Sequence, residues 1–184
     1  MKKFYAGVGS RETPPEILDL MTEAARWLRR EGWILRSGHA PGADWAFEQG
    51  AEKDSVIYLP WPSFGQVKYQ DDPGRPVLGE AICLPRSALF VRYEILVKDR
   101  IHSRARSDSV KMLHGRNHAQ IFGHLETEPA SAFVLCWCEE VGGKPQGGTA
   151  TAVKLARKHG IPVYNLWLPE DLEWVRNGIT AGRK

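Results

Sequence analysis

The sequence predicts an α/β protein with a doubly wound, mostly parallel sheet of about five strands and helices on both faces. Short apolar runs, each as long as a strand, alternate with amphipathic stretches of helical period. The connections between them are short near both ends of the chain, as is typical of a parallel sheet covered on both faces. Glycine-rich loops follow three of the apolar runs.

The first unit of the pattern is a strand, a loop and a helix. Residues 3–8 form an apolar run, and residues 9–15 follow as a loop that ends in two prolines, which suit a helix start. Across residues 16–30 the apolar side chains recur on one helical face, and Gly32 ends the predicted helix.

The second unit repeats this order. Residues 33–35 read as a strand, residues 38–42 as a loop and residues 43–51 as a helix whose inner face is apolar. Residues 55–59 then predict a third strand.

The middle of the chain breaks the alternation. Residues 60–85 are rich in proline and show no clean period, so we interpret about 60–130 as an insertion into one domain that spans residues 1–184. Within it, residues 87–101 and 107–122 predict two helices.

Regular alternation resumes after the insertion. Residues 132–138 form an almost unbroken apolar run suited to a central parallel strand, and residues 150–159 predict a helix. Gly160 and Pro162 mark the end of that helix, and the remaining predicted elements are a strand at 163–166 and a helix at 170–177.

Composition excludes several classes of protein. Hydrophobic residues at 42% and charged residues at 26% are ordinary for a soluble domain, and the net charge of +3 favours an anionic partner only slightly. Three cysteines form neither a disulfide framework nor a zinc-ligand spacing, which favours a reducing compartment. We also expect no metal and no resident cofactor. No apolar run approaches the ~20 residues needed to cross a bilayer, and we expect a cytoplasmic protein without membrane contact.

Three glycine-rich loops carry the predicted binding site. Each follows a strand and precedes a helix, and the carboxyl ends of parallel strands open on the same edge of the sheet. Glycine lets a ligand approach the backbone, and amides at a helix start attract anions. The candidate ligand-binding residues are Gly7, Gly9, Ser10 and Arg11 in the first loop, Ser37, Gly38, Gly42 and Asp44 in the second, and Gly147, Gly148 and Thr149 in the third.

Three further side chains have predicted positions. We expect His39 to be exposed on the second loop and Trp137 to lie in the core. Trp61, in the proline-rich segment, is the better candidate for a lid over the pocket.

These loops carry a resemblance to a known family. The segments GVGSR at 7–11, SGHAPGAD at 37–44 and GGTATAVKLA at 147–156, followed by GIPVYNL at 160–166, resemble the SLOG superfamily. That superfamily groups the DNA-processing protein DprA and the LOG-type nucleotide phosphoribohydrolases on a Rossmann-like fold. The sequence is most similar to the small DprA-like proteins of phages and mobile elements, over about residues 3–59 and 131–167.

This chain lacks the glutamate that is central to the LOG-type hydrolases. LOG-type enzymes carry the motif PGGxGTxxE, whose glutamate assists cleavage of the N-glycosidic bond. Laid over residues 146–154, the motif places Ala150 at the third glycine and Lys154 at the glutamate. The carboxylates that remain as substitutes are Asp44, Glu48 and Glu94, and each is also explained as a surface or capping group.

The DprA branch implies binding of single-stranded DNA. Basic residues that would contact such a ligand lie in the unmatched middle, and their alternative is a solvated helical face. They are Arg100, Arg104, Arg106, Lys111 and Arg116. His114 and His118 lie four residues apart but lack the carboxylate that a metal site would add.

The sequence therefore predicts a nucleotide- or nucleic-acid-phosphate-binding, DprA-like protein whose partner is a nucleotide or single-stranded nucleic acid. Two alternatives stay open: a nucleoside 5′-monophosphate N-glycosidase, and a sensor or sponge that holds a signalling nucleotide without altering it. Whether the chain is an enzyme and whether it forms a homo-oligomer also stay open.

Overall fold

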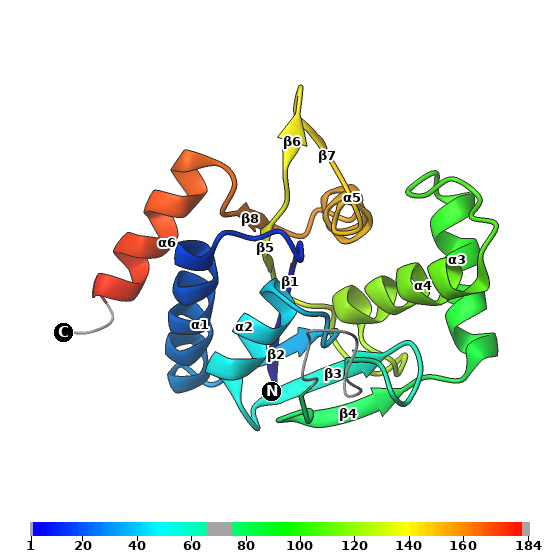
Figure 1. The fold of residues 1–184 in the computed structure, drawn as a ribbon, viewed down its shortest axis with the longest axis horizontal. Helices are drawn as coiled ribbons and strands as arrows, with labels where there is room; N and C mark the ends of the chain where they lie inside the picture. The colour runs from blue at the N-terminus through cyan, green and yellow to red at the C-terminus, as the bar shows by residue number, and fades with distance from the viewer. Residues whose placement is uncertain (1, 66–74, 182–184) are drawn as a thin grey trace.

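A six-stranded parallel sheet forms the centre of the protein (Figure 1). The computed structural model describes residues 2–65 and 75–181. In sheet order the strands are β4 (Glu80–Cys83), β3 (Ser55–Leu59), β2 (Trp33–Ser37), β1 (Lys3–Gly9), β5 (Val134–Trp137) and β8 (Val163–Asn165). Every pair of neighbours runs parallel, which confirms the predicted α/β class and adds one strand to the expected number.

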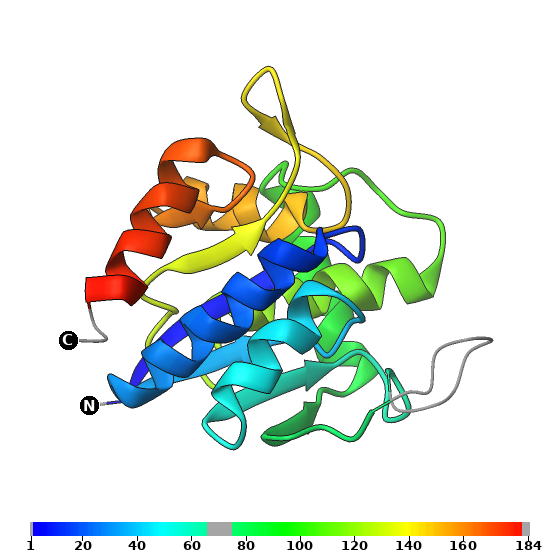
Figure 2. The ribbon, with the colours of Figure 1, turned by 60° about the vertical axis from the view of Figure 1, so that its left-hand side comes forward.

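Helices cover both faces of this sheet. Helices α1 (Pro15–Arg30), α2 (Ala43–Ala51) and α6 (Pro169–Ala181) share one core cluster, in which they meet Tyr5 and Leu35. Helices α4 (Asp108–Phe122) and α5 (Ala150–Lys158) lie on the other side, and both pack with Ala6 and Val8. Tyr5 and Ala6 are successive residues of β1, so their side chains face opposite layers. Figures 1 and 2 show the two layers from different sides.

Helix α3 (Arg86–Lys98) packs against α4 on the outside of the second layer (Figure 1). The two helices approach closely at Gly115, where a Cβ atom would overlap the backbone carbonyl of Leu89. The predicted helices at 87–101 and 107–122 therefore correspond to α3 and α4, with ends shifted by a few residues.

The sequence pattern missed strand β4. Three of its four residues, Glu80, Ala81 and Cys83, are exposed, because the strand lies at the edge of the sheet. An exposed edge strand needs no apolar run, so hydrophobic periodicity gives no signal for it.

The predicted third loop is divided by a small hairpin. Strands β6 (Glu140–Val141) and β7 (Lys144–Pro145) pair antiparallel and project from the body of the protein (Figure 2). Gly142 and Gly143 form its turn with φ values of 57° and 72°. Such a two-residue turn requires positive φ at both positions. These two glycines therefore shape the hairpin, and Gly147–Thr149 are left to open helix α5.

The strand order reverses between β1 and β5. From β1 the chain moves outward through β2, β3 and β4, and then returns to pair β5 with the other edge of β1. Open α/β sheets bind ligands at the carboxyl ends of the strands at such a switch point. None of the described helices combines the length and the apolar composition needed to cross a bilayer.

Candidate functional site

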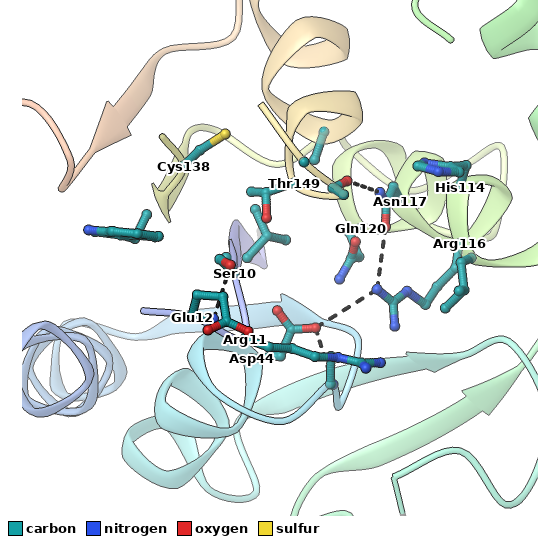
Figure 3. A pocket seen from close by; sticks show the side chains of 18 of the residues that line it. Ser10, Arg11, Glu12, Asp44, His114, Arg116, Asn117, Gln120, Cys138 and Thr149 are labelled. Atoms are coloured by element: carbon teal, nitrogen blue, oxygen red, sulfur yellow. Dashed lines mark hydrogen bonds and ion pairs between the residues drawn. The ribbon is translucent and has the colours of Figure 1, made fainter. Parts of the chain in front are cut away.

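A cavity of about 470 Å³ lies at the carboxyl ends of β1 and β5, where the strand order reverses (Figure 3). The first and third glycine loops and one side of α4 form most of its wall. The residues that matter for its chemistry are Gly9, Ser10, Arg11, Glu12, Asp44, His114, Arg116, Asn117, Gln120, Trp137, Cys138, Glu139, Gly147, Gly148 and Thr149.

Hydrogen bonds to the Ser10 backbone hold the first loop in place. The Ser10 amide donates to the carbonyl of Trp137 at 3.3 Å, and the Ser10 carbonyl accepts from the Thr13 hydroxyl at 2.8 Å. Arg11 follows with an exposed side chain. A fixed turn thus presents a cation at the rim of the cavity.

The predicted residues of the second loop divide into two groups. Asp44 lines the cavity, whereas Ser37, Gly38 and Gly42 are not among its lining residues. The Ser37 hydroxyl donates to the Gly7 carbonyl at 2.7 Å, and a Cβ atom on Gly38 would overlap the Arg116 guanidinium. These residues support the wall from behind.

Gly7, from the first loop, has a similar supporting position. It is not a lining residue, and a Cβ atom there would lie 2.6 Å from Leu35 Cδ1 and 2.7 Å from Phe47 Cγ. The glycine allows α2 to pack closely on the sheet.

His39 is buried, and the prediction that it is exposed is wrong. Its Nδ1 lies 2.6 Å from Glu48 Oε2, and its Nε2 lies 3.0 Å from the Arg75 carbonyl oxygen. Burial alone would lower the pKa of His39, but the hydrogen bond and charge of Glu48 outweigh it and raise the pKa. The other Glu48 oxygen accepts from the Leu78 amide at 2.6 Å. Glu48 therefore ties residues 75–78 to helix α2 and is not among the lining residues of the cavity.

The third loop opens helix α5 toward the cavity. Thr149 is the N-cap residue, and both Gly147 and Gly148 have open space where a Cβ atom would lie. The carbonyl of Gly148 accepts from the Asn117 side chain at 3.3 Å, which fixes the loop to α4. The first amides of a helix have no acceptor within the helix, so they are free to bind an anion.

Arg116 lies inside the cavity wall rather than on an open basic surface. Its Nη1 donates to the Gly38 carbonyl at 2.8 Å, and its Nη2 lies 3.9 Å from Asp44 Oδ2. Burial lowers the pKa of Arg116 and raises that of Asp44, while each charge opposes the shift of the other. Arg116 is therefore set apart from the exposed Arg100, Arg104 and Arg106, and its role in nucleic-acid binding stays a prediction.

Two histidines of α4 have separate partners. His114 lines the cavity, and its Nδ1 lies 2.9 Å from the Thr151 hydroxyl. Burial, followed by the nearby His102 and Arg116, lowers the pKa of His114 to about 4. His118 Nδ1 instead lies 3.0 Å from Arg92 Nη1. Among the described residues, no group of three or more His, Cys, Asp or Glu side chains is arranged to hold a metal ion.

The other predicted basic residues lie outside the cavity. Arg104 Nη1 pairs with Glu94 Oε1 at 3.2 Å, and Lys111 Nζ pairs with Asp108 Oδ1 at 3.1 Å. Arg100 and Arg106 are exposed. Glu94 is exposed as well, so of the three candidate carboxylates only Asp44 lines the cavity.

Trp137 packs against the core but is half-buried and also lines the cavity, so the prediction that it lies in the core is confirmed only in part. Trp61 is not a lining residue, but its ring packs on Phe64 with centroids 5.1 Å apart, and Phe64 lines the cavity. The aromatic wall is therefore supplied by Trp137 and Phe64.

The sequence interpretation did not identify the residues of α4 as part of the cavity wall. Leu113, Arg116, Asn117 and Gln120 recur at intervals of three and four residues, so they share one face of the helix. Polar residues on the buried face of a predicted helix are the signal that could have identified them.

Comparisons with known proteins show a shared fold. No protein-family model matches the sequence, and no curated protein matches it. The solved Moco carrier protein of Chlamydomonas reinhardtii is similar in one structure with 18% identity, coverage of 99% of this chain and 86% of that chain, and a TM-score of 0.52. A second structure of that protein gives 19% identity, coverage of 96% and 84%, and a TM-score of 0.51. DNA processing protein A from Helicobacter pylori, which binds single-stranded DNA, gives 13% identity, coverage of 97% and 79%, and a TM-score of 0.43, and this weaker likeness does not itself assign the fold.

Proposed function

We propose that this protein binds a nucleotide through its phosphate in the cavity at the carboxyl ends of β1 and β5. The observation that carries the proposal is that Gly147–Thr149, at the start of α5, and Ser10–Arg11 line one cavity. A helix start, a glycine pair and an arginine together form a site that favours an anion.

Two arginine side chains support this assignment. Arg11 and Arg116 both line the cavity, and Asp44 lies 3.9 Å from Arg116 Nη2. Asp44 therefore compensates the buried Arg116, whereas Arg11 is exposed at the rim. Glu12 and Glu139 also line the cavity, so we place the phosphate at the free amides of the third loop and at Arg11 rather than by overall charge.

Single-stranded DNA offers the same phosphate chemistry on a longer ligand. The resemblance of the three loop segments to DprA-like proteins favours single-stranded DNA as the ligand. If the ligand is instead a free nucleotide that is bound without being altered, the protein is a nucleotide sensor. The cavity volume, about 470 Å³, lies within the ~300–1,000 Å³ of ordinary small-molecule sites.

The test is a binding measurement with Gly148→Asp. Gly148 has open space for a side chain, so the substitution adds a carboxylate to the site without a packing clash. We expect calorimetry to show that affinity for a nucleoside 5′-monophosphate falls at least tenfold, since about 1.4 kcal/mol corresponds to that factor and a charge-assisted contact contributes more.

Gly178→Asp is the matched control. Gly178 lies in α6, also with open space for a Cβ atom, and is not a lining residue of the cavity. Equal affinity of both variants and the parent protein would remove the third loop from the site. A mononucleotide and a single-stranded oligonucleotide are measured side by side, so that a free nucleotide and nucleic acid are distinguished.

A nucleotide N-glycosidase is the second candidate, favoured by one observation. Asp44 lines the cavity, where its carboxylate lies beside Arg116. A carboxylate within reach of the ligand is a group that cleavage of a glycosidic bond requires.

A further inference from the structure

We propose that Trp137 is the stacking surface for a nucleobase, so that a bound nucleotide places its ring against this indole and its phosphate at Gly147–Thr149. The inference rests on the proposed function and deepens it, because it assigns the non-phosphate part of the ligand. The ligand must therefore carry a flat aromatic ring.

Trp137 joins the cavity to the first loop. It is the last residue of β5, and its carbonyl oxygen accepts the Ser10 amide at 3.3 Å. Its neighbour Cys138 also lines the cavity, as does Glu139. Trp137 is thus a lining residue whose backbone is bonded to the first of the loops that we assign to phosphate binding.

A ring contact of Trp137 and two hydrogen bonds of its neighbour Cys138 hold this part of the chain in place. The rings of Trp137 and Trp167 form a T-shaped pair with centroids 5.2 Å apart and an interplanar angle of 79°. After Trp137, the Cys138 amide donates to Asn165 Oδ1 at 2.9 Å, and Asn165 Nδ2 donates to the Cys138 carbonyl at 2.7 Å. A stacking surface that is already fixed loses little entropy when a ligand binds.

The opposite wall of the cavity is less suitable for a base. Both amide atoms of Gln120 and the Nε of Arg116 are fully buried and without a hydrogen-bond partner among the described residues. A ligand could reach them only after side-chain movement. Trp137, in contrast, lines the cavity and is only half-buried.

Trp137 also differs from the two exposed tryptophans, Trp167 and Trp174. Trp174 is 58% exposed, but its neighbour in the structure is Tyr164, which stacks on it with centroids 4.5 Å apart. Trp174 and Trp167 are not among the cavity's lining residues. Only Trp137 of these three adjoins the anion-binding loops.

The experiment compares a ligand with a base and one without. Adenosine 5′-monophosphate and ribose 5-phosphate share the sugar phosphate and differ in the ring. We expect Trp137→Ala to weaken binding of adenosine 5′-monophosphate by about 5- to 150-fold, the usual effect of losing one base–aromatic stack. Binding of ribose 5-phosphate should change by less than about twofold, and Trp137→Phe should retain most of the affinity, because a ring is kept.

Trp174→Ala is the control, because it removes an exposed indole that stacks on Tyr164 away from the cavity. It should leave both affinities unchanged. If Trp137→Ala does not fold, the parent protein still decides the question: the base must add at least fivefold over ribose 5-phosphate, and the Trp137→Phe variant must lose part of the ligand-induced change in indole fluorescence.

Three results would overturn the inference. Equal losses for both ligands would make Trp137 a support of the first loop, and no loss for either would place the base elsewhere. Equal binding of both ligands by the parent protein would mean that no base is recognised, with phosphate binding intact. Failure of both ligands to bind would instead reject the proposed function, and the inference with it.

Discussion

Arg116 of α4 and Asp44 of α2 form a buried ion pair, with Nη2 of Arg116 3.9 Å from Oδ2 of Asp44. The two residues come from helices on opposite faces of the sheet and meet at its carboxyl edge (Figure 3). The pair therefore joins the layers at the cavity, and each partner compensates a charge that burial disfavours.

Removing one charge of this pair should destabilise the fold. Asp44→Asn keeps the size of the side chain but leaves the Arg116 guanidinium buried without its carboxylate. We expect urea denaturation to show a loss of about 3 kcal/mol, as is usual when one partner of a buried pair is removed. Glu94→Gln, in the exposed pair with Arg104, should cost less than about 1 kcal/mol. Equal effects of the two substitutions would contradict a structural role for the Asp44 charge.

The Glu48 carboxylate should control the titration of His39. Because the folded-state pKa of His39 is raised, protonation of its ring contributes stability below the unfolded pKa, and this is lost as pH rises through the folded pKa. Glu48→Gln should lower the titration midpoint of His39 measured by NMR, whereas Glu52→Gln, near the end of the same helix, should leave it unchanged. An unaltered midpoint in Glu48→Gln would show that the short contact contributes little.

His118 should change the pH dependence of stability in the opposite direction from His39. Burial, with Arg92 as the next cause, lowers its pKa to about 4, so between about pH 6.5 and 4 the unfolded chain binds the proton more readily than the folded protein. Stability therefore falls as pH falls through this window. We expect His118→Asn to reduce the loss between pH 7 and 5 by about 1 kcal/mol, after allowance for solvent screening at a partly exposed site. Urea unfolding at both pH values measures it, and an unchanged pH dependence would exclude this contribution.

The protein should release no free base from nucleoside 5′-monophosphates. Lys154 stands where the resembled hydrolases carry glutamate, and it is exposed on α5. Chromatography of the reaction mixture should show only background base. If base does appear and Asp44→Asn abolishes its release while nucleotide binding persists, the glycosidase interpretation replaces simple binding.

The basic residues outside the cavity should matter only for a long ligand. Binding of a single-stranded oligonucleotide through about four phosphates would give a log–log salt slope near −3, at about −0.7 for each phosphate. Changing Arg104 and Arg106 together to Ala should flatten the slope by about one unit and leave mononucleotide affinity unchanged. A slope that the double substitution does not alter would mean that these exposed side chains are a solvated face.

Part of the site could be predicted from the sequence, because strand topology determines it. Ser10, Arg11 and Gly148 follow two strands whose carboxyl ends share one edge, and they line one cavity. Their role in binding stays a prediction. Arg116 could not be placed in the same way, because its position depends on how the inserted helix α4 packs over the sheet.

The burial of two side chains, Trp137 and His39, could not be predicted from the sequence pattern. Trp137 ends an apolar run, and periodicity cannot tell that the last residue of a strand extends beyond the helices that cover it. His39 lies in a loop with φ of 61°, yet it is buried because Glu48, nine positions along the chain, provides its partner. Such a pairing follows from tertiary packing alone.

The central place of β1 also bears on how the chain folds during synthesis. Residues 3–9 are made before residues 134–137, with which one edge of this strand pairs. At the usual ~5–20 residues per second, translation of the roughly 125 intervening residues takes about 6 to 25 s. Throughout that time the nascent chain carries an apolar strand with a free edge, a configuration that favours pairing with other chains. We expect the dependence of folding on chaperones to be greatest in this interval. A ligand that contacts both Ser10 and Gly148 can stabilise the chain only after the interval has passed.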